Sequence, residues 1–79
     1  MTQAIIYDRL TRILEDVFDD DSLRATPDLT AKDVDGWDSL THIRFMLSVE
    51  KAFGIKFSTA EIGKLEKIGD LAALIDARA

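Results

Sequence analysis

The chain has 79 residues, enough for one small domain, and 47% of them are hydrophobic, so it is expected to fold rather than to stay disordered. It contains no cysteine, which excludes a disulfide framework and a thiolate metal site. No apolar run reaches the roughly 18 residues of a membrane span, and residues 1–4 lack the layout of a signal peptide. We therefore expect a single domain over residues 1–79 that is cytoplasmic and not inserted in a membrane.

Negative charge is concentrated in one segment of the chain. The net charge is −5, but residues 15–38 hold nine acidic residues against only Arg24 and Lys32. This segment would repel nucleic acid phosphates, and it suits protein partners with basic surfaces. Its acids do not match an EF-hand calcium loop, because Leu23 and Trp37 stand where an oxygen ligand is needed. The sequence therefore predicts no nucleic acid binding and no metal site.

Apolar residues recur at helical spacing in most of the chain, and no strand pattern competes with them. This periodicity predicts an all-α, four-helix bundle with three longer helices and one short helix. We expect long helices over residues 3–18 and 39–53, a short helix from Ser58 to about Leu65, and a last helix over about residues 69–77. The expected core comprises Ile6, Leu10, Ile13, Val17, Phe45, Met46, Val49, Phe53, Phe57, Ile62, Ile68, Leu71 and Ile75.

Particular residues mark the ends of the expected helices. Asp38 is a good N-cap for the second helix, and Gly54 suits the left-handed conformation that ends it. Ser58 and Glu61 match a capping box at the start of the short helix. The stretch between the first two helices, residues 19–37, has no sustained period, and a loop of that length usually signals function. Its apolar residues Leu23, Leu29, Val34 and Trp37 are the candidates for pinning this loop to the core, and we expect Trp37 to be partly buried.

The tripeptide Asp-Ser-Leu occurs twice, as residues 21–23 and 38–40. Pro27 follows the first copy closely, so no long helix can begin there. Ser39 in the second copy opens an amphipathic helix, where unpaired N–H groups and the helix dipole favour negative charge. A phosphodiester on the Ser39 hydroxyl would lie in that field, although serine is also common at helix starts for structural reasons.

The motif Asp35-Gly36-Trp37-Asp38-Ser39-Leu40 resembles the attachment site of acyl carrier proteins. The resemblance covers nearly the whole chain, including Glu50-Lys51-Ala52-Phe53-Gly54-Ile55 at the end of the second helix and Ile68-Gly69-Asp70-Leu71 at the start of the last. It implies a monomeric carrier without catalytic residues. In such carriers a serine, here Ser39, accepts 4'-phosphopantetheine from coenzyme A, and the arm then holds an acyl group as a thioester. Trp37, Asp38 and Leu40 are the expected neighbours of the arm.

The implied partners are a phosphopantetheinyl transferase and enzymes that load or transfer acyl groups, such as synthases, acyltransferases and ligases that charge acyl carriers. The second helix is the docking surface in these families. Its Leu40, Ile43 and Leu47 fall on the side opposite Phe45 and Met46, so we expect them to be exposed beside the serine. Arg44 would select partners with an acidic group, and Asp35 completes the expected partner-binding set.

The sequence departs from carriers of housekeeping fatty acid synthesis, whose second helix is strongly acidic. Here that helix carries Arg44 and Lys51 against Glu50, and Lys67 stands where a capping hydroxyl residue is usual. These departures favour a specialised fatty acyl, polyketide or lipid pathway.

Alternatives remain open at this point: a peptidyl carrier with aminoacyl cargo, or a helical docking module without modification. An enzyme using Asp38, Ser39 and His42 would also need an oxyanion site and a pocket. We expect His42 to be a packed residue.

Overall fold

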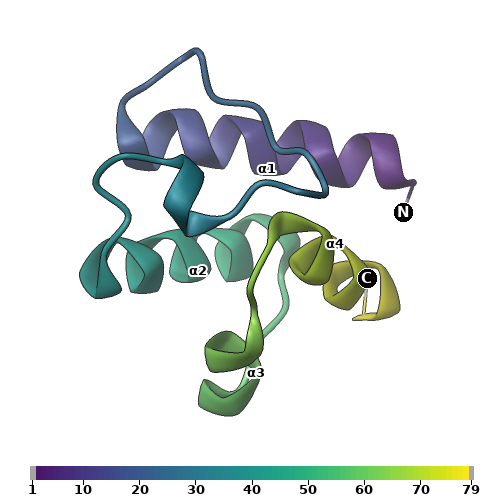
Figure 1. Ribbon diagram of the computed structural model, residues 1–79. Coiled ribbons are helices and arrows are strands. Elements are labelled where there is room, and N and C mark those ends of the chain that lie inside the picture. Colours follow the sequence, from purple (N-terminus) through teal and green to yellow (C-terminus); the bar gives the residue numbers. More distant parts are fainter. Residues whose placement is uncertain (1, 79) are drawn as a thin grey trace.

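The computed structural model describes residues 2–78 and confirms the all-α architecture (Figure 1). In chain order the α-helices are α1 (Gln3–Phe18), α2 (Ser39–Phe53), α3 (Thr59–Lys64) and α4 (Ile68–Arg78). The bounds expected for the first two helices are confirmed. Helix α4 begins one residue before the expected start, and α3 ends one residue before the expected end. Among the described residues, no helix is long and apolar enough to cross a membrane.

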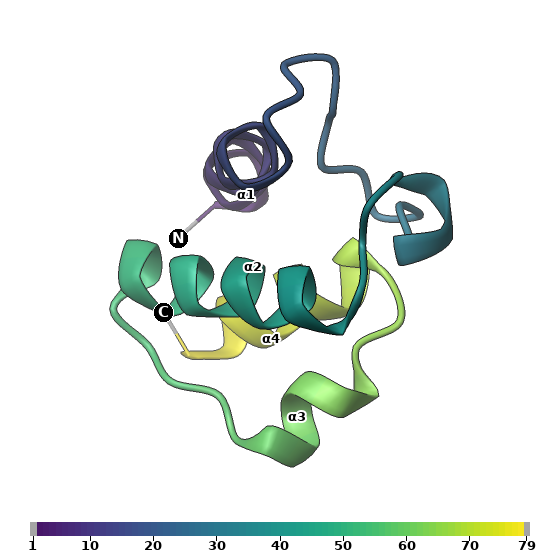
Figure 2. The same ribbon diagram turned by 90° about the vertical axis from the view of Figure 1, so that its left-hand side faces the viewer.

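Helix α1 packs on α2 and α4, while α3 lies apart from α1 at the far side of the bundle (Figures 1 and 2). The core forms where the three longer helices meet. It is built from Ile6, Leu10 and Leu14 of α1, from Phe45, Met46 and Val49 of α2, and from Ile68, Leu71, Ala72 and Ile75 of α4. Burial of these apolar side chains holds the three longer helices together. Helix α3 contributes no fully buried residue.

The predicted core is correct in its centre and wrong at its edges. Four residues predicted as core, Ile13, Val17, Phe53 and Ile62, are only half-buried. Their positions at the margins of the apolar stripes leave part of each side chain at the surface. The prediction omitted the buried residues Leu14, Ala25 and Ala72, whereas Val34, a candidate for pinning the loop, is buried. Ala25 lies in the loop, where no helical period signals burial.

Local hydrogen bonds account for the helix ends that the sequence predicted. The Asp38 side chain accepts a hydrogen bond from the backbone N–H of Thr41 at 2.8 Å, which caps α2. Gly54 has a φ of 67° and ends α2 in the left-handed region, where glycine has no Cβ penalty. Ser58 and Glu61 form the reciprocal bonds of a capping box at α3. These caps fix where α2 and α3 begin.

The long loop is more ordered than the sequence suggested. It contains a short 3₁₀ helix, η1 (Ala31–Asp33), which the absence of a period did not predict. The loop is tied to the start of α4, because the N–H groups of Ile68 and Gly69 donate to the carbonyls of Leu29 and Pro27 at 2.9 and 3.0 Å. A Cβ at Gly69 would lie 2.9 Å from the Pro27 oxygen, so this close approach requires glycine. The loop is thereby anchored on the side of the bundle that carries Ser39.

Candidate functional site

Ser39 is the first residue of α2 and is exposed. The turn before it is fixed by Thr41, whose hydroxyl donates to the Gly36 carbonyl at 3.0 Å and also contacts the Asp38 carboxylate at 2.8 Å. Gly36 itself has a φ of 83°, a conformation that glycine adopts without strain. Ser39 is therefore presented to solvent from a hydrogen-bonded turn at a helix N-terminus, where negative charge is favoured.

Asp38 stays ionised beside the serine. Hydrogen bonds from the backbone and then the side chain of Thr41 lower the pKa of the Asp38 carboxyl below its ordinary value of 3.8. The carboxylate is directed at the helix cap, so it serves to hold the turn. The position expected for Asp38 from the sequence, next to Ser39 as the N-cap, is confirmed.

Trp37 is half-buried, as expected, and anchors the loop by aromatic contacts. Its ring lies 5.0 Å from the Phe18 ring and 5.3 Å from the Phe45 ring, measured between centroids. Both distances fall in the range of favourable aromatic pairs. The indole N–H donates to Nδ1 of His42 at 3.2 Å. Trp37 thus connects α1, the loop and α2 two residues before Ser39.

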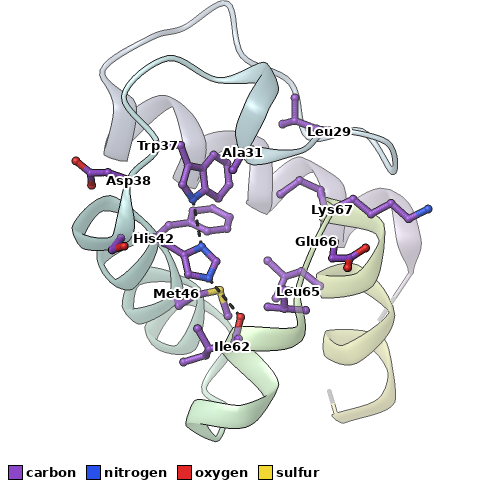
Figure 3. Close-up of a pocket in the computed structure, with 15 residues that line it drawn as sticks. Leu29, Ala31, Trp37, Asp38, His42, Met46, Ile62, Leu65, Glu66 and Lys67 are labelled. Atoms are coloured by element: carbon purple, nitrogen blue, oxygen red, sulfur yellow. Dashed lines mark hydrogen bonds between the residues drawn. The ribbon is translucent and has the colours of Figure 1, made fainter.

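A cavity of about 430 Å³ opens next to Ser39, and the sequence did not predict it (Figure 3). Ser39, Trp37 and His42 line it at one side, together with apolar residues of α2 such as Met46. Ile62 lines it from the opposite side, on α3. Periodicity could not reveal this space, because it depends on how α3 is placed relative to α2. The structure therefore has a largely apolar space directly beside Ser39.

His42 is half-buried and packed, as expected, and it does not form a catalytic triad. Its Nδ1 accepts from Trp37, and its Nε2 lies 3.4 Å from the carbonyl oxygen of Ile62. Asp38 bonds to Thr41 rather than to the imidazole. Both ring nitrogens of His42 therefore face other partners, and neither contacts Ser39 as a general base would have to.

An exposed apolar stripe runs along α2, as the helical spacing predicted. Leu40 is 65% exposed, Ile43 52% and Leu47 60%. We call these three residues the α2 stripe. Large apolar side chains gathered on one exposed face are unusual for a monomeric surface and mark a candidate interface.

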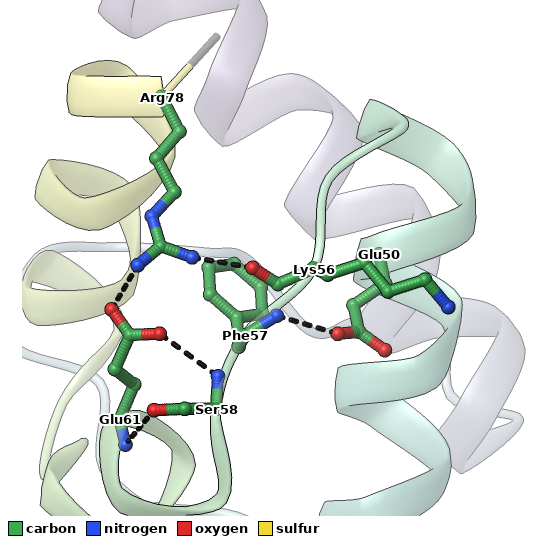
Figure 4. Close-up of polar contacts among 6 residues, drawn as sticks. All are labelled: Glu50, Lys56, Phe57, Ser58, Glu61 and Arg78. Carbon is green, nitrogen blue, oxygen red and sulfur yellow. Dashed lines mark hydrogen bonds and ion pairs between the residues drawn. The ribbon is translucent and has the colours of Figure 1, made fainter.

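The charged residues Glu50 and Arg44 of α2 and Glu61 of α3 differ in how the protein uses them. Glu50 accepts a hydrogen bond from the Phe57 N–H at 2.6 Å, and Glu61 pairs with Arg78 and caps α3 (Figure 4). The hydrogen bond from Ser58 and the charge of Arg78 lower the pKa of Glu61 below 4.5. Within residues 2–78, Arg44 has no ion pair or side-chain hydrogen bond and is exposed. The glutamates of α2 and α3 are thus engaged internally, whereas Arg44 faces solvent.

The comparisons with known proteins agree with this site. Residues 8–75 match the family defined by a phosphopantetheine attachment site. The structure is similar to the solution structure of a holo acyl carrier protein from Geobacter metallireducens, with a TM-score of 0.85 and 46% identity. That alignment covers 91% of this chain and 83% of the other. No match was found among the curated proteins.

The family of this chain follows from two findings. The family model covers most of the chain, and a solved structure is 46% identical to it. Members of this family work with phosphopantetheinyl transferases and acyl-handling enzymes. The chain belongs to the phosphopantetheine-attachment family and is an acyl carrier protein, which bears a covalent 4'-phosphopantetheine and is a carrier rather than an enzyme.

Proposed function

We propose that Ser39 is the residue that bears the phosphopantetheine arm. The observation that supports this assignment is the exposed Ser39 hydroxyl at the N-terminus of α2, presented by a turn that Asp38 and Thr41 hold in place. A phosphodiester there gains from the helix dipole. Ser22 is also exposed, but its hydroxyl donates to Asp20 in a loop turn that no long helix follows.

The arm supplies a thiol that holds an acyl group as a thioester. The fit of the site to such a group rests on the exposed serine and on the cavity that it lines. We assign the cavity to the apolar part of the cargo, because most of the residues that line it are apolar, among them Phe45, Met46, Leu65 and Leu71. An acyl chain placed there would leave water, which is favourable for each methylene buried.

Mass spectrometry tests the attachment site. The protein is incubated with coenzyme A, magnesium and a transferase of broad specificity. We expect one phosphopantetheine on the wild type and on Ser22→Ala, and none on Ser39→Ala, with unchanged helical circular dichroism in both variants. Modification that persists in Ser39→Ala would exclude Ser39 as the attachment residue.

The α2 stripe is the surface that we assign to partner enzymes, with Asp35 and Arg44 as its charged neighbours. A partner that fits it has an apolar recess for Leu40, Ile43 and Leu47 and an acidic group opposite Arg44. The use of Glu50 within the protein supports this polarity, since its carboxylate already accepts a hydrogen bond from the Phe57 N–H. Such complementarity mainly sets partner choice and association rate.

We further propose that the cargo belongs to a specialised fatty acyl, polyketide or lipid pathway. The support is the basic character of α2, with Arg44 and Lys51 exposed. Partners built for a strongly acidic second helix would meet repulsion at these two residues. Mass spectrometry of the protein purified from its own host, with arm and cargo intact, identifies the acyl group.

A further inference from the structure

His42 brings a polar group into the largely apolar cavity beside Ser39. Its imidazole is half-buried and lies between Trp37 and Ile62, which also line the cavity (Figure 3). The other charged or hydroxyl side chains that line the cavity are all exposed to solvent: Asp38, Ser39, Glu66 and Lys67. A chain that enters the cavity therefore leaves those groups in water but still meets His42.

Trp37 determines which ring nitrogen of His42 carries the proton. An indole N–H can only donate, and that of Trp37 lies 3.2 Å from Nδ1 of His42, so Nδ1 accepts. The neutral imidazole then carries its proton on Nε2, the nitrogen that faces the Ile62 carbonyl. His42 therefore presents a donor rather than an acceptor on this side of the ring.

The Nε2–H donor of His42 is only weakly used within the protein. The Ile62 carbonyl oxygen is 3.4 Å from Nε2, beyond the usual N–H to oxygen distance of about 2.7–3.2 Å. That oxygen also faces the Leu65 N–H, at 3.4 Å, so Ile62 keeps a partner when His42 turns to another acceptor. An oxygen that comes within the usual distance of Nε2 therefore forms a better hydrogen bond than the one it replaces.

The order of residues along α2 indicates which part of an acyl chain meets His42. Ser39, His42 and Met46 all line the cavity. The rise of an α-helix places His42 about 4.5 Å from Ser39 along the helix axis and Met46 about 10.5 Å from it. A chain that enters from the side of Ser39 thus has its first carbons beside His42 and its later carbons beside Met46.

We propose that His42 is a specificity-determining residue, which donates a hydrogen bond to an oxygen near the thioester end of the acyl chain, such as a hydroxyl on its third carbon. This inference rests on the proposed attachment at Ser39 and on the proposed place of the cargo. An oxygen farther along the chain lies beside apolar residues such as Met46, where its loss of water is not compensated. The carrier therefore shelters a chain that is oxygenated near the thioester better than one with the same oxygen at its far end.

Cleavage of the thioester by hydroxylamine measures how well each chain is sheltered. The holo protein is loaded with octanoyl, 3-hydroxyoctanoyl or 7-hydroxyoctanoyl, and each rate in a variant is divided by the wild-type rate, so that the intrinsic reactivity of the chain cancels. His42→Phe keeps an aromatic ring but removes the donor. We expect it to speed cleavage of 3-hydroxyoctanoyl about fivefold, the population change that one hydrogen bond typically supplies. Cleavage of the other two chains should not become faster.

His42→Gln separates the donor from the packing of the ring. The glutamine amide also donates a hydrogen bond, so this variant should cleave 3-hydroxyoctanoyl within about twofold of the wild-type rate. If His42 acts only by packing, the loss of its ring in His42→Phe speeds the cleavage of all three chains by the same factor. That result overturns the specificity role, whatever the melting temperatures of the variants.

NMR spectra of the wild type carry the test if His42→Phe does not fold. The Nε2–H resonance of His42 should shift when 3-hydroxyoctanoyl replaces octanoyl, and it should stay in place when 7-hydroxyoctanoyl does so. Identical resonances in the three loaded forms overturn the inference. A shift that is already complete in the holo protein without cargo assigns the donor to an amide oxygen of the arm, and this also overturns a role in the choice of cargo.

Failure of this inference is distinguishable from failure of the proposals beneath it. Cleavage of octanoyl as fast as acetyl in the wild type overturns the assignment of the cavity to cargo, and with it the role of His42. A missing arm at Ser39, seen by mass before loading, overturns the attachment site instead.

Discussion

The tripeptide Asp-Ser-Leu has two different structures in this protein. In the first copy, the backbone N–H and hydroxyl of Ser22 both donate to Asp20, and Leu23 packs against the edge of the core. In the second copy, Asp38 caps α2, Ser39 starts the helix and Leu40 is 65% exposed. The same three side chains thus point in different directions. The structure that the tripeptide adopts therefore depends on the segment that follows it.

The residues after each copy explain the difference. Ala25 is buried, and its N–H is bonded to the Thr11 hydroxyl at 2.9 Å, which draws the chain onto α1. Pro27 then supplies no N–H and disfavours a helical residue before it. After Ser39, by contrast, the apolar pattern of α2 continues to Phe53. Burial of the apolar face, with Phe45, Met46 and Val49, stabilises this long helix.

The largest contrast is expected at the leucine of each copy. Leu40→Asp should leave the melting temperature nearly unchanged, because the side chain is exposed, yet slow arm transfer at least about tenfold, since central apolar contacts dominate interfaces. Leu23→Asp should lower the free energy of unfolding by about 2 kcal/mol, because it places a charge against the core. Thermal melts and transferase kinetics on folded protein measure both effects.

Leu47→Asp tests whether the effect of Leu40→Asp arises only because Leu40 is next to Ser39. Leu47 lies two helical turns beyond Leu40 on the α2 stripe, so its substitution should slow arm transfer or acyl loading without disturbing Ser39 itself. Unfolding of Leu47→Asp would show that the stripe is part of the core. A normal transfer rate in both leucine variants of α2 would exclude the stripe as the transferase surface.

A smaller contrast is expected at the aspartates. Asp38→Ala removes the N-cap of α2 and should lower the melting temperature by about a few degrees. Asp21→Ala should have almost no effect, since the Asp21 carboxylate makes no hydrogen bond within the described residues. Asp38→Asn should behave nearly as wild type because asparagine also caps helices. Equal melting temperatures for the two alanine variants would mean that the cap does not stabilise α2.

The sequence predicted the elements that local rules control and missed those that depend on placement. Asp38, Gly54 and the capping box of Ser58 could be identified because each cap needs residues close in sequence. The exposed α2 stripe followed from the helical period alone. The cavity, and the contact between His42 and Ile62, could not be predicted, because residues 20 apart meet only once α3 is positioned.

Acid should weaken the capped helices through two carboxylates. Hydrogen bonds from Thr41 hold the pKa of Asp38 below 3.8, and those from Ser58, with the charge of Arg78, hold the pKa of Glu61 below 4.5. Because both pKa values are lower in the folded state, their stabilisation is complete above the ordinary values and is lost as pH falls through the folded ones. Thermal melts should show this modest loss below about pH 4. Asp38→Asn should show less of it, and an identical pH profile would exclude the Asp38 contribution.

The smallest effect on the melting temperature is expected from salt, which acts on the loop that contains the first Asp-Ser-Leu copy. Asp19, Asp20 and Asp21 are consecutive and exposed, so they repel one another at neutral pH, and added salt screens this repulsion. Asp20 already accepts hydrogen bonds from Ser22, which offsets part of the cost. We therefore expect salt or millimolar magnesium to raise the melting temperature by only about one to two degrees. Asp21→Asn should reduce that rise, whereas Asp76→Asn on α4 should not. The same salt response in all three proteins would place the repulsion outside this loop.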